Sequence, residues 1–450
     1  MKKSEIMALN LEKRDYFCSV KRIKDTFNKR FALLFILVFS ILGAADAQKT
    51  ESQEENDSII VSLLTCAPHD EVYALYGHSA LRYCDLKTGE DWAFNYGVFN
   101  FNKPYFVLRF TFGLTDYELG VIPYDLFVRE YAKTGRQVTQ QVLNLTHEEK
   151  LKVREALAIN YRPENRIYRY NYFYDNCTTR ARDIIERCVS GEVIYNDASI
   201  PVNGRPDESK GKDTYRKEIH LLTRSHPWAA FGNDLCLGAK ADFTIDYRQR
   251  QFLPHNLFDD FATATIKDLS GHSRPLVKST DVEVPSNPKK ASDDGFCPTP
   301  LQCATAFFFV SMVIVLAERK LKHTFIIWDL SLMLVVGIAG FIVLALFFSE
   351  HPTTSTNLQI LLLNPALLFF IPSVWREHKS RKAQQASMKG IGAKRSRYWI
   401  FSLICLILYS LGAIIQDYAE GMAFLALSLL TRCYIHRYID AQSCAKKTRQ

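Results

Sequence analysis

The sequence predicts an α+β domain with a mainly antiparallel sheet, exported from the cytoplasm and followed by an all-α domain of five transmembrane helices. Three observations lead to this fold class. A basic segment precedes a short apolar run near the N-terminus. Strand-type and helical patterns alternate over the next part of the chain, and five long apolar stretches lie beyond residue 300. A chain of 450 residues is long enough for both domains.

The N-terminal region has the features of a secretory signal. The basic stretch KRIKDTFNKR precedes the apolar run 31–45, and Ala45 and Ala47 form an A-x-A pattern that predicts cleavage after Ala47. The run is shorter than the roughly 20 apolar residues that a spanning helix needs. We therefore expect residues 1–47 to be a signal peptide with an extended basic region. An uncleaved anchor is the alternative, and it would export the following chain equally well.

The C-terminal part predicts five membrane spans, because each apolar stretch approaches the length of a bilayer-crossing helix. The stretches cover residues 301–317, 325–348, 358–375, 398–415 and 421–438. A transmembrane domain over residues 301–438 follows.

The charges of the connecting loops predict the orientation of these spans. Loops 318–324 and 376–397 are rich in Lys and Arg, whereas loops 349–357 and 416–420 contain none. Basic loops stay in the cytoplasm. The chain is therefore expected in the inner (cell) membrane, with its N-terminal domain in the periplasm and a cytoplasmic tail. The tail covers residues 439–450. Much of the net charge of +8 lies in these loops and in the signal, so no nucleic-acid partner is expected.

The exported domain, residues 48–271, shows strand patterns, a capped helix and an aromatic extended stretch. The expected strands are 58–65, 79–84, 91–99 and 138–145. Thr146 and Glu149 form a capping box in front of a helix. The aromatic stretch 168–175 leads into a second helix after Cys177, which Gly191 can close.

Residues 272–300 are expected to be a linker to the membrane, because they contain five prolines and many charges. The exported part holds six cysteines, for which an oxidising compartment permits disulfides whose pairing the sequence does not give. CxxC and metal-type Cys/His spacings are absent from the sequence, as are the phosphate-binding glycine loops. We therefore expect no metal and no cofactor.

The candidate catalytic residues are Cys177, at the start of the second helix, and His78, between a glycine and a strand. Free amides and the positive end of the dipole at a helix N-terminus favour a thiolate. A histidine can accept the thiol proton, and a third polar group can hold its ring. We expect that group to be Asn95, on the neighbouring antiparallel strand. The alternatives are a structural or disulfide-bonded cysteine and a structural histidine. Arg182 is a candidate contact for a phosphate.

Several motifs resemble the lipoprotein N-acyltransferase family of Bacteroidetes, formerly a family of unknown function. They are LLTCAPHDEVYALYGHSALRY, FNYGVFNF, YFYDNCTTRARDII and LGAKADFTIDYRQRQFLPHNL in the exported part, and EHPTTSTNLQILLLNP in the membrane part. That family is similar to circularly permuted papain-like folds of the NlpC/P60 superfamily, in which the histidine precedes the cysteine. The resemblance implies His78 and Cys177 as the catalytic pair of a membrane-bound acyltransferase.

The expected reaction moves an acyl chain from a membrane phospholipid, through a Cys177 thioester, to the α-amine of a lipoprotein's N-terminal diacylglyceryl-cysteine. Its partners would be phospholipid, diacylated lipoproteins and the bilayer. His351, Asn357 and Asn364 are expected near the outer membrane face, where they could touch lipid headgroups; alternatively, Asn357 and Asn364 only cap and break a helix. The rival functions are a membrane-anchored peptidoglycan amidase or peptidase, and a non-catalytic exported binding domain.

Overall fold

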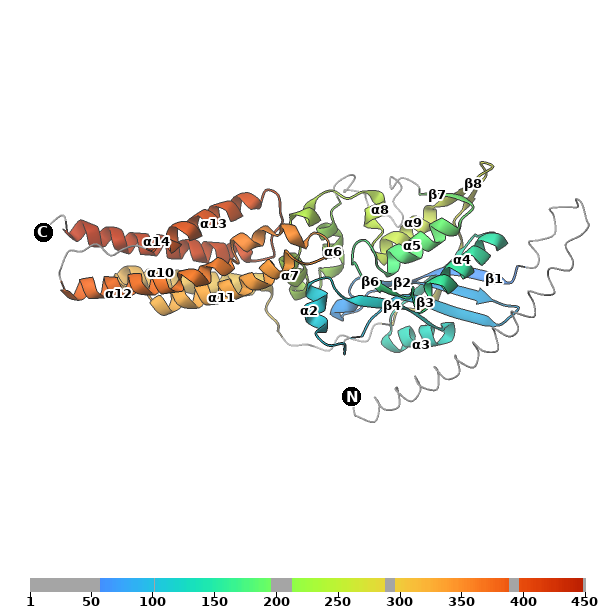
Figure 1. The fold of residues 1–450 in the computed structure, drawn as a ribbon, viewed down its shortest axis with the longest axis horizontal. Coiled ribbons are helices and arrows are strands. Elements are labelled where there is room, and N and C mark those ends of the chain that lie inside the picture. The colour runs from blue at the N-terminus through green and yellow to red at the C-terminus, as the bar shows by residue number, and fades with distance from the viewer. Residues whose placement is uncertain (1–56, 101, 196–212, 288–295, 388–395, 448–450) are drawn as a thin grey trace, which may run out of the picture. The chain divides into compact units, whose positions relative to one another are not determined.

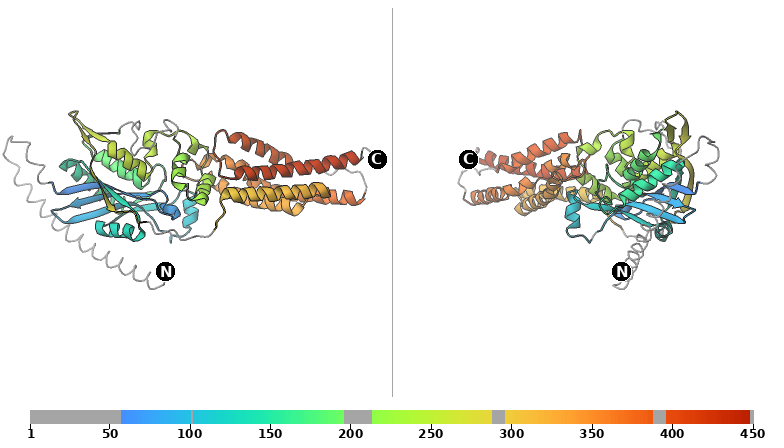
Figure 2. Two further views of the ribbon diagram at one scale, coloured as in Figure 1. Left: turned by 180° about the vertical axis from the view of Figure 1, so that it is seen from behind. Right: turned by 45° about the vertical axis from the view of Figure 1, so that its right-hand side comes forward.

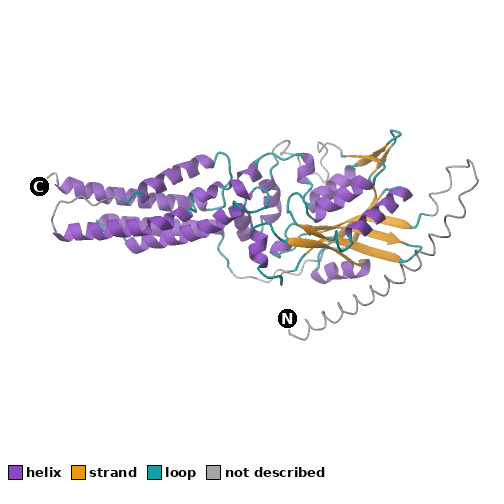
Figure 3. Ribbon diagram, in the orientation of Figure 1, coloured by secondary structure: helices purple, strands orange, loops and turns teal. Residues whose placement is uncertain are grey.

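The computed structural model describes residues 57–100, 102–195, 213–287, 296–387 and 396–447. The expected signal peptide 1–47 lies outside these ranges. Strands occur only in the described residues before 285, and the described residues from 300 onward are helical apart from their connections (Figure 3).

A seven-stranded antiparallel sheet forms the centre of the exported domain, with the order β10-β5-β1-β2-β3-β4-β6. The pattern-based strands 58–65, 79–84, 91–99 and 138–145 are confirmed within a few residues. The strands are β1 (Ile59–Cys66), β2 (His78–Asp85), β3 (Glu90–Val98), β4 (Asp116–Pro123), β5 (Val138–Leu143), β6 (Ile167–Arg169) and β10 (Val277–Val284).

Helices cover both faces of the sheet (Figures 1 and 2). On one face, α4 (His147–Asn160), α5 (Cys177–Cys188) and α9 (Pro254–Thr263) share a hydrophobic core with the buried side chains of β1 and β2. Alternate residues of the same strands pack against α3 (Tyr124–Thr134) on the other face. Because strand side chains alternate between faces, β1 supplies Leu63 to the first core and Leu64 to the second.

Both helices that the sequence predicts in this domain are present. Thr146 accepts a hydrogen bond from the Glu149 amide, and the Glu149 carboxylate accepts one from the Thr146 amide, so the predicted capping box opens α4. The helix after Cys177 ends at Cys188. The sequence predicts that Gly191 ends this helix, so the helix is shorter than expected. Gly191 instead begins β7 (Gly191–Ile194) with φ +141°, and a Cβ there would lie 2.2 Å from the Lys267 carbonyl oxygen.

The expected linker 272–300 is in part folded. β7 pairs with β8 (Thr265–Asp268) and β8 with β9 (Ser273–Pro275), and the chain then enters β10, the edge strand of the main sheet. Most β10 side chains are exposed, as its charged sequence VKSTDVEV allows at a sheet edge. Its charges and the flanking prolines are typical of a linker, so the sequence pattern did not predict this strand.

Between β7 and β8 in the sequence, the chain forms a helical subregion. It contains α6 (Tyr215–Thr223), α7 (Pro227–Cys236), the 3₁₀ turn η3 (Ala239–Asp242) and α8 (Tyr247–Arg250). A second short helix, α2 (Phe106–Thr111), and the 3₁₀ turn η2 (Val72–Ala74) lie near the ends of β3 and β2 in the sequence. The sequence patterns described above did not predict these elements.

The C-terminal part contains α10 (Pro300–Leu321), α11 (Ile326–Leu346), α12 (Ile371–Ser387), α13 (Tyr398–Gly412) and α14 (Met422–Lys447). The 3₁₀ turns η4 (Thr354–Thr356), η5 (Leu358–Leu361) and η6 (Pro365–Phe370) join α11 to α12. Among the described residues, three segments are long and apolar enough to cross a membrane: Pro300–Leu321, Ile326–Leu346 and Leu358–Lys382. The helix α13 is apolar but shorter, and α14 continues into the expected tail 439–450 as far as Lys447.

Buried charges connect these helices to one another. Arg432 of α14 forms ion pairs with Glu318 of α10 and Asp329 of α11. His436 bonds Asp329 and stacks on the Trp399 ring of α13, with centroids 3.7 Å apart. Buried charges are costly unless they are paired, so this network fixes how the helices pack.

Candidate active site

Cys177 is the first residue of α5, and Asn176 caps the helix. The Asn176 side-chain oxygen accepts hydrogen bonds of 2.9 Å from the amides of Thr178 and Thr179. Its amide group donates to the carbonyls of Tyr172 and Phe252, which ties the helix start to two other segments. The cap thus occupies the second and third amides of the helix, and it does not take that of Cys177.

His78 and Asn95 lie on neighbouring antiparallel strands. His78 is the first residue of β2, after Gly77, whose φ of +74° suits glycine. The ring Nε2 of His78 and the Asn95 Oδ1 are 2.5 Å apart, so the Nε2–H donates to the amide oxygen. This bond fixes the tautomer and leaves Nδ1 as the ring nitrogen available to a thiol.

Cys177 lies beside the His78 ring. Gly97 of β3 lies beside both residues: a Cβ built on it would be 4.0 Å from Cys177 Cβ and 4.0 Å from His78 Cε1. The structure therefore brings the three expected catalytic residues together, with a glycine beside the reactive pair. A side chain at position 97 would occupy this space.

The surroundings of Cys177 favour its thiolate. Burial raises the pKa of the Cys177 thiol, but the charge and hydrogen bond of His78, the Ser79 amide and the Thr178 hydroxyl together lower it to about 7. Burial lowers the pKa of His78, and the thiolate and Asn95 more than offset this, so the pKa of the imidazole is raised. A thiolate–imidazolium pair with an oriented ring is the arrangement of a cysteine nucleophile.

The other described cysteines differ from Cys177. The nine cysteines from Cys66 to Cys433 are free thiols. Burial raises the pKa of Cys66 to about 12 and also raises that of Cys188, on the same helix as Cys177. Over the described ranges, no three His, Cys, Asp or Glu side chains gather as a possible metal site.

The segment that precedes Cys177 contacts the loop between α11 and η4. The Tyr172 hydroxyl donates to the Pro352 carbonyl at 2.8 Å, and the Tyr172 ring lies 4.8 Å from the His351 ring. Arg169 forms an ion pair with Glu350 at 3.3 Å. Because Tyr172 is five residues before Cys177, their Cα atoms are within about 18 Å. No sequence pattern predicts this connection, although His351 is one of the residues expected near the outer membrane face.

The remaining predicted site residues have other partners. Arg182 is buried and bonds Asp183, the Arg248 carbonyl and Gln251 on the body of the exported domain. The ring of His351 is hydrogen-bonded to the Phe110 carbonyl.

Asn357 and Asn364 make their hydrogen bonds in the segment that joins α11 to α12 and with the nearby α7. Asn357 donates to the Leu235 carbonyl and caps η5, and Asn364 caps η6. The structure thus gives both asparagines the capping role that the sequence left open, and their hydrogen bonds do not join them to the Cys177 cluster.

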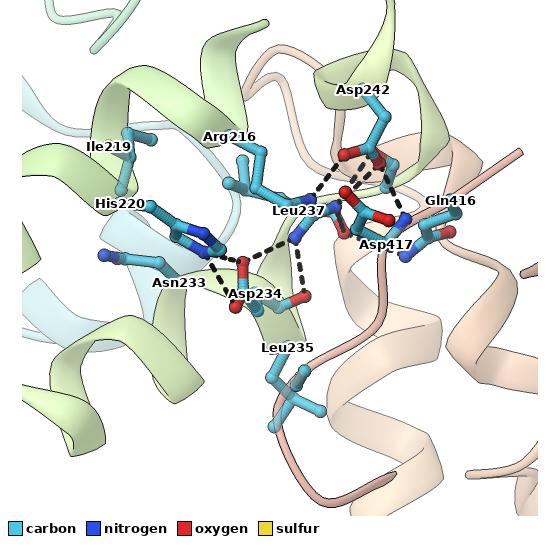
Figure 4. Close-up of polar contacts among 12 residues, drawn as sticks. Arg216, Ile219, His220, Asn233, Asp234, Leu235, Leu237, Asp242, Gln416 and Asp417 are labelled. Carbon is cyan, nitrogen blue, oxygen red and sulfur yellow. Dashed lines mark hydrogen bonds and ion pairs between the residues drawn. The ribbon is translucent and has the colours of Figure 1, made fainter. Parts of the chain in front are cut away.

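A polar network attaches the helical subregion to the loops of the C-terminal helices (Figure 4). Arg216 is fully buried and forms ion pairs of 2.7 Å with Asp234 and with Asp242. Asp242 accepts a hydrogen bond from the Asp417 amide, and Gln416 donates to the Leu237 carbonyl. The sequence gave no signal for this network, because its charges are far apart along the chain.

Comparison with known proteins places the two domains in one family. The family model described as the Lnb N-terminal periplasmic domain matches residues 46–204, and the one described as the Lnb transmembrane domain matches residues 291–443. No curated protein and no solved structure matches the chain at a significant level.

The fold and these matches define a membrane protein with a periplasmic N-terminal domain and a helical transmembrane domain. The chain belongs to the Lnb family, the lipoprotein N-acyltransferase family that its motifs resemble. Residues 205–290, which lie between the two matches, supply Arg216 and the edge strand β10.

Proposed function

We propose that this protein is a lipoprotein N-acyltransferase with Cys177 as its nucleophile. The acyl donor is a membrane phospholipid, and the acceptor is the free α-amine of a lipoprotein's N-terminal diacylglyceryl-cysteine. The observation that carries the proposal is the grouping of Cys177, His78 and Asn95 at the start of α5. The segment before Cys177 is bonded through Tyr172 to the loop between α11 and η4. A nucleophile in that place can reach substrates that are anchored in the membrane.

The first half-reaction forms a thioester. The Cys177 sulfur attacks the ester carbonyl carbon, and the Cys177 amide at the start of α5 stabilises the oxyanion. The carbon–sulfur bond forms, the ester carbon–oxygen bond breaks, and His78 gives its proton to the leaving lysophospholipid oxygen.

The second half-reaction forms the amide. The lipoprotein α-amine attacks the thioester carbonyl, the carbon–nitrogen bond forms and the carbon–sulfur bond breaks. Neutral His78 takes a proton from the amine, which regenerates the thiolate–imidazolium pair. Asn95 holds the ring in both halves, so it is a positioning residue.

The membrane arrangement that suits this reaction has five spans and a cytoplasmic C-terminus. Loops 318–324 and 376–397 carry the Lys and Arg residues, and loop 349–357, which contacts the periplasmic domain, carries none. The order of His78 before Cys177 also accords with a permuted papain-like fold. Two lipid-anchored substrates that diffuse in the same leaflet gain effective concentration at such a site.

Mass spectrometry of lipoprotein N-termini tests the proposal in three strains: one with the chain, one without it and one with Cys177→Ala. Triacylated N-termini are expected with the intact chain and in a fourth, matched control strain with Cys188→Ala, and not in the other two strains. Unchanged triacylation without the chain contradicts the proposal. Release of wall peptides by the purified protein, without acyl transfer, would favour a peptidoglycan hydrolase instead.

A further inference from the structure

The helix α2 exposes apolar side chains on the surface of the periplasmic domain. Tyr105 is 80% exposed, Val107 76% and Leu108 57%, and Phe110 is also exposed. Soluble surfaces do not usually gather apolar groups in this way, and such patches mark binding sites. Tyr105, Val107 and Leu108 line an open hollow of about 600 Å³, together with Lys103, Phe106 and Thr111.

The connections of α2 place this patch beside the membrane domain. The His351 ring is hydrogen-bonded to the Phe110 carbonyl, and the Glu350 amide donates to the Phe112 carbonyl at 3.0 Å. Gly113 lies so close to this loop that a Cβ built on it would be 2.8 Å from the backbone nitrogen of His351. Residues 350–351 follow the end of the apolar helix α11, so α2 lies at the level where that helix leaves the bilayer.

A row of aromatic rings leads from α2 toward the nucleophile. Phe106 stacks on Phe99 at 5.8 Å, Phe99 meets Tyr117 at 5.0 Å, and Tyr117 meets Tyr170 at 4.2 Å between ring centroids. Tyr170 and Cys177 both pack against the hydrophobic core that contains Tyr117. Burial and then the charge of Cys177 raise the pKa of the Tyr170 phenol. The row is aromatic along its length and leads to the core on which the reactive group packs.

We propose that α2 is the lipid-entry element of this protein: its apolar side enters the periplasmic leaflet, and the ring row from Phe106 to Tyr170 receives an acyl chain of the phospholipid donor. The basic Lys103 beside the hollow suits the phosphate of the headgroup. This inference rests on the proposed acyltransferase function for its substrate, but the entry of α2 into the leaflet is measurable without any activity.

The first experiment measures insertion of α2 in vesicles of phosphatidylethanolamine and phosphatidylglycerol that contain the full-length protein. Val107→Trp places a fluorophore on α2, and Leu269→Trp, at a position 94% exposed in the β8–β9 turn, is the control. Lipids brominated near the carbonyl are expected to quench the added fluorescence of the first variant and not that of the second. Absence of quenching for Val107→Trp, or equal quenching for both, overturns the proposal.

The second experiment measures acyl transfer from the same phospholipids. The double variant Val107→Ser/Leu108→Ser is expected to raise the KM for phospholipid roughly tenfold or more, because two exposed apolar anchors are lost. Alkylation of Cys177 by iodoacetamide is expected to stay unchanged, which shows that the site still folds. Leu269→Ser serves as the control and is expected to leave the KM unchanged.

An unchanged KM in the double variant overturns the entry role. If the wild-type protein takes no acyl group from phospholipid, the proposed function and the acyl-chain role fail together. The quenching result then still decides whether α2 enters the leaflet, so failure of the function and failure of the insertion are distinguishable.

Discussion

Replacing His78 by alanine is expected to raise the pKa of Cys177 and to change how its alkylation depends on pH. In the intact site the thiol has a pKa of about 7, against an ordinary value of 9.0. This difference corresponds to about 3 kcal/mol in favour of the thiolate. His78 is the largest of the groups that lower the pKa, so its removal raises the pKa, and the ordinary thiol value of 9.0 serves as the reference for the variant.

The expected change in rate follows from the thiolate fraction and from nucleophilicity. At pH 7 about half of the wild-type Cys177 is thiolate, against about 1% in the variant. A thiolate of higher pKa is more nucleophilic, by about eightfold here for a Brønsted slope of about 0.45. Alkylation at pH 7 should therefore fall about sixfold, and the two pH profiles should cross near pH 8.

The assay is iodoacetamide labelling of the full-length protein in detergent, with the Cys177 peptide quantified by mass spectrometry across a pH series. Cys188 is the internal control, because it is buried on the same helix and is expected to stay unlabelled in both folded proteins. A shared midpoint in both proteins, or profiles that never cross, would refute the reasoning.

Three further changes have expected outcomes. Asn95→Ala removes the acceptor for His78 and should lower kcat about 10- to 100-fold, since such bonds to charged groups contribute about 1.5–3 kcal/mol; Asn95→Asp should restore most of it, and no rescue would contradict a positioning role. Asn176→Ala should lower the free energy of unfolding by about 1 kcal/mol because the helix cap is lost. A further loss is expected because the carbonyls of Tyr172 and Phe252 lose their donor. Thermal melts of this variant and of the exposed control Asn165→Ala measure the difference, and equal melting temperatures would contradict it. Arg216→Ala should destabilise by about 3–5 kcal/mol, because two buried aspartates lose their partner; limited proteolysis that cuts both proteins equally would count against it.

Local sequence patterns predicted the elements that carry the candidate site well. The capping box at Thr146, the strands that carry His78 and Asn95, and the helix that begins at Cys177 all have short-range signals, and the structure contains each of them. The pattern of apolar helices also identified the membrane domain.

Contacts between distant segments left no such signals. The strand β10 is charged and flanked by prolines, and only its edge position makes it a strand. The bond of Tyr172 to Pro352 joins residues 180 positions apart, so spacing could not reveal it. The apolar helix α2 spans only residues 106–111, too few for a helical period to be recognised.

The mass of the Cys177 peptide tests the central claim most directly. The full-length protein is incubated with a phospholipid of defined acyl chain, without lipoprotein acceptor, and digested at mildly acid pH. We expect one acyl group on Cys177 that hydroxylamine removes, that moves to a diacylated lipopeptide when this is added, and that is absent in Cys177→Ala. Acyl transfer to the lipopeptide by the Cys177→Ala protein would contradict it.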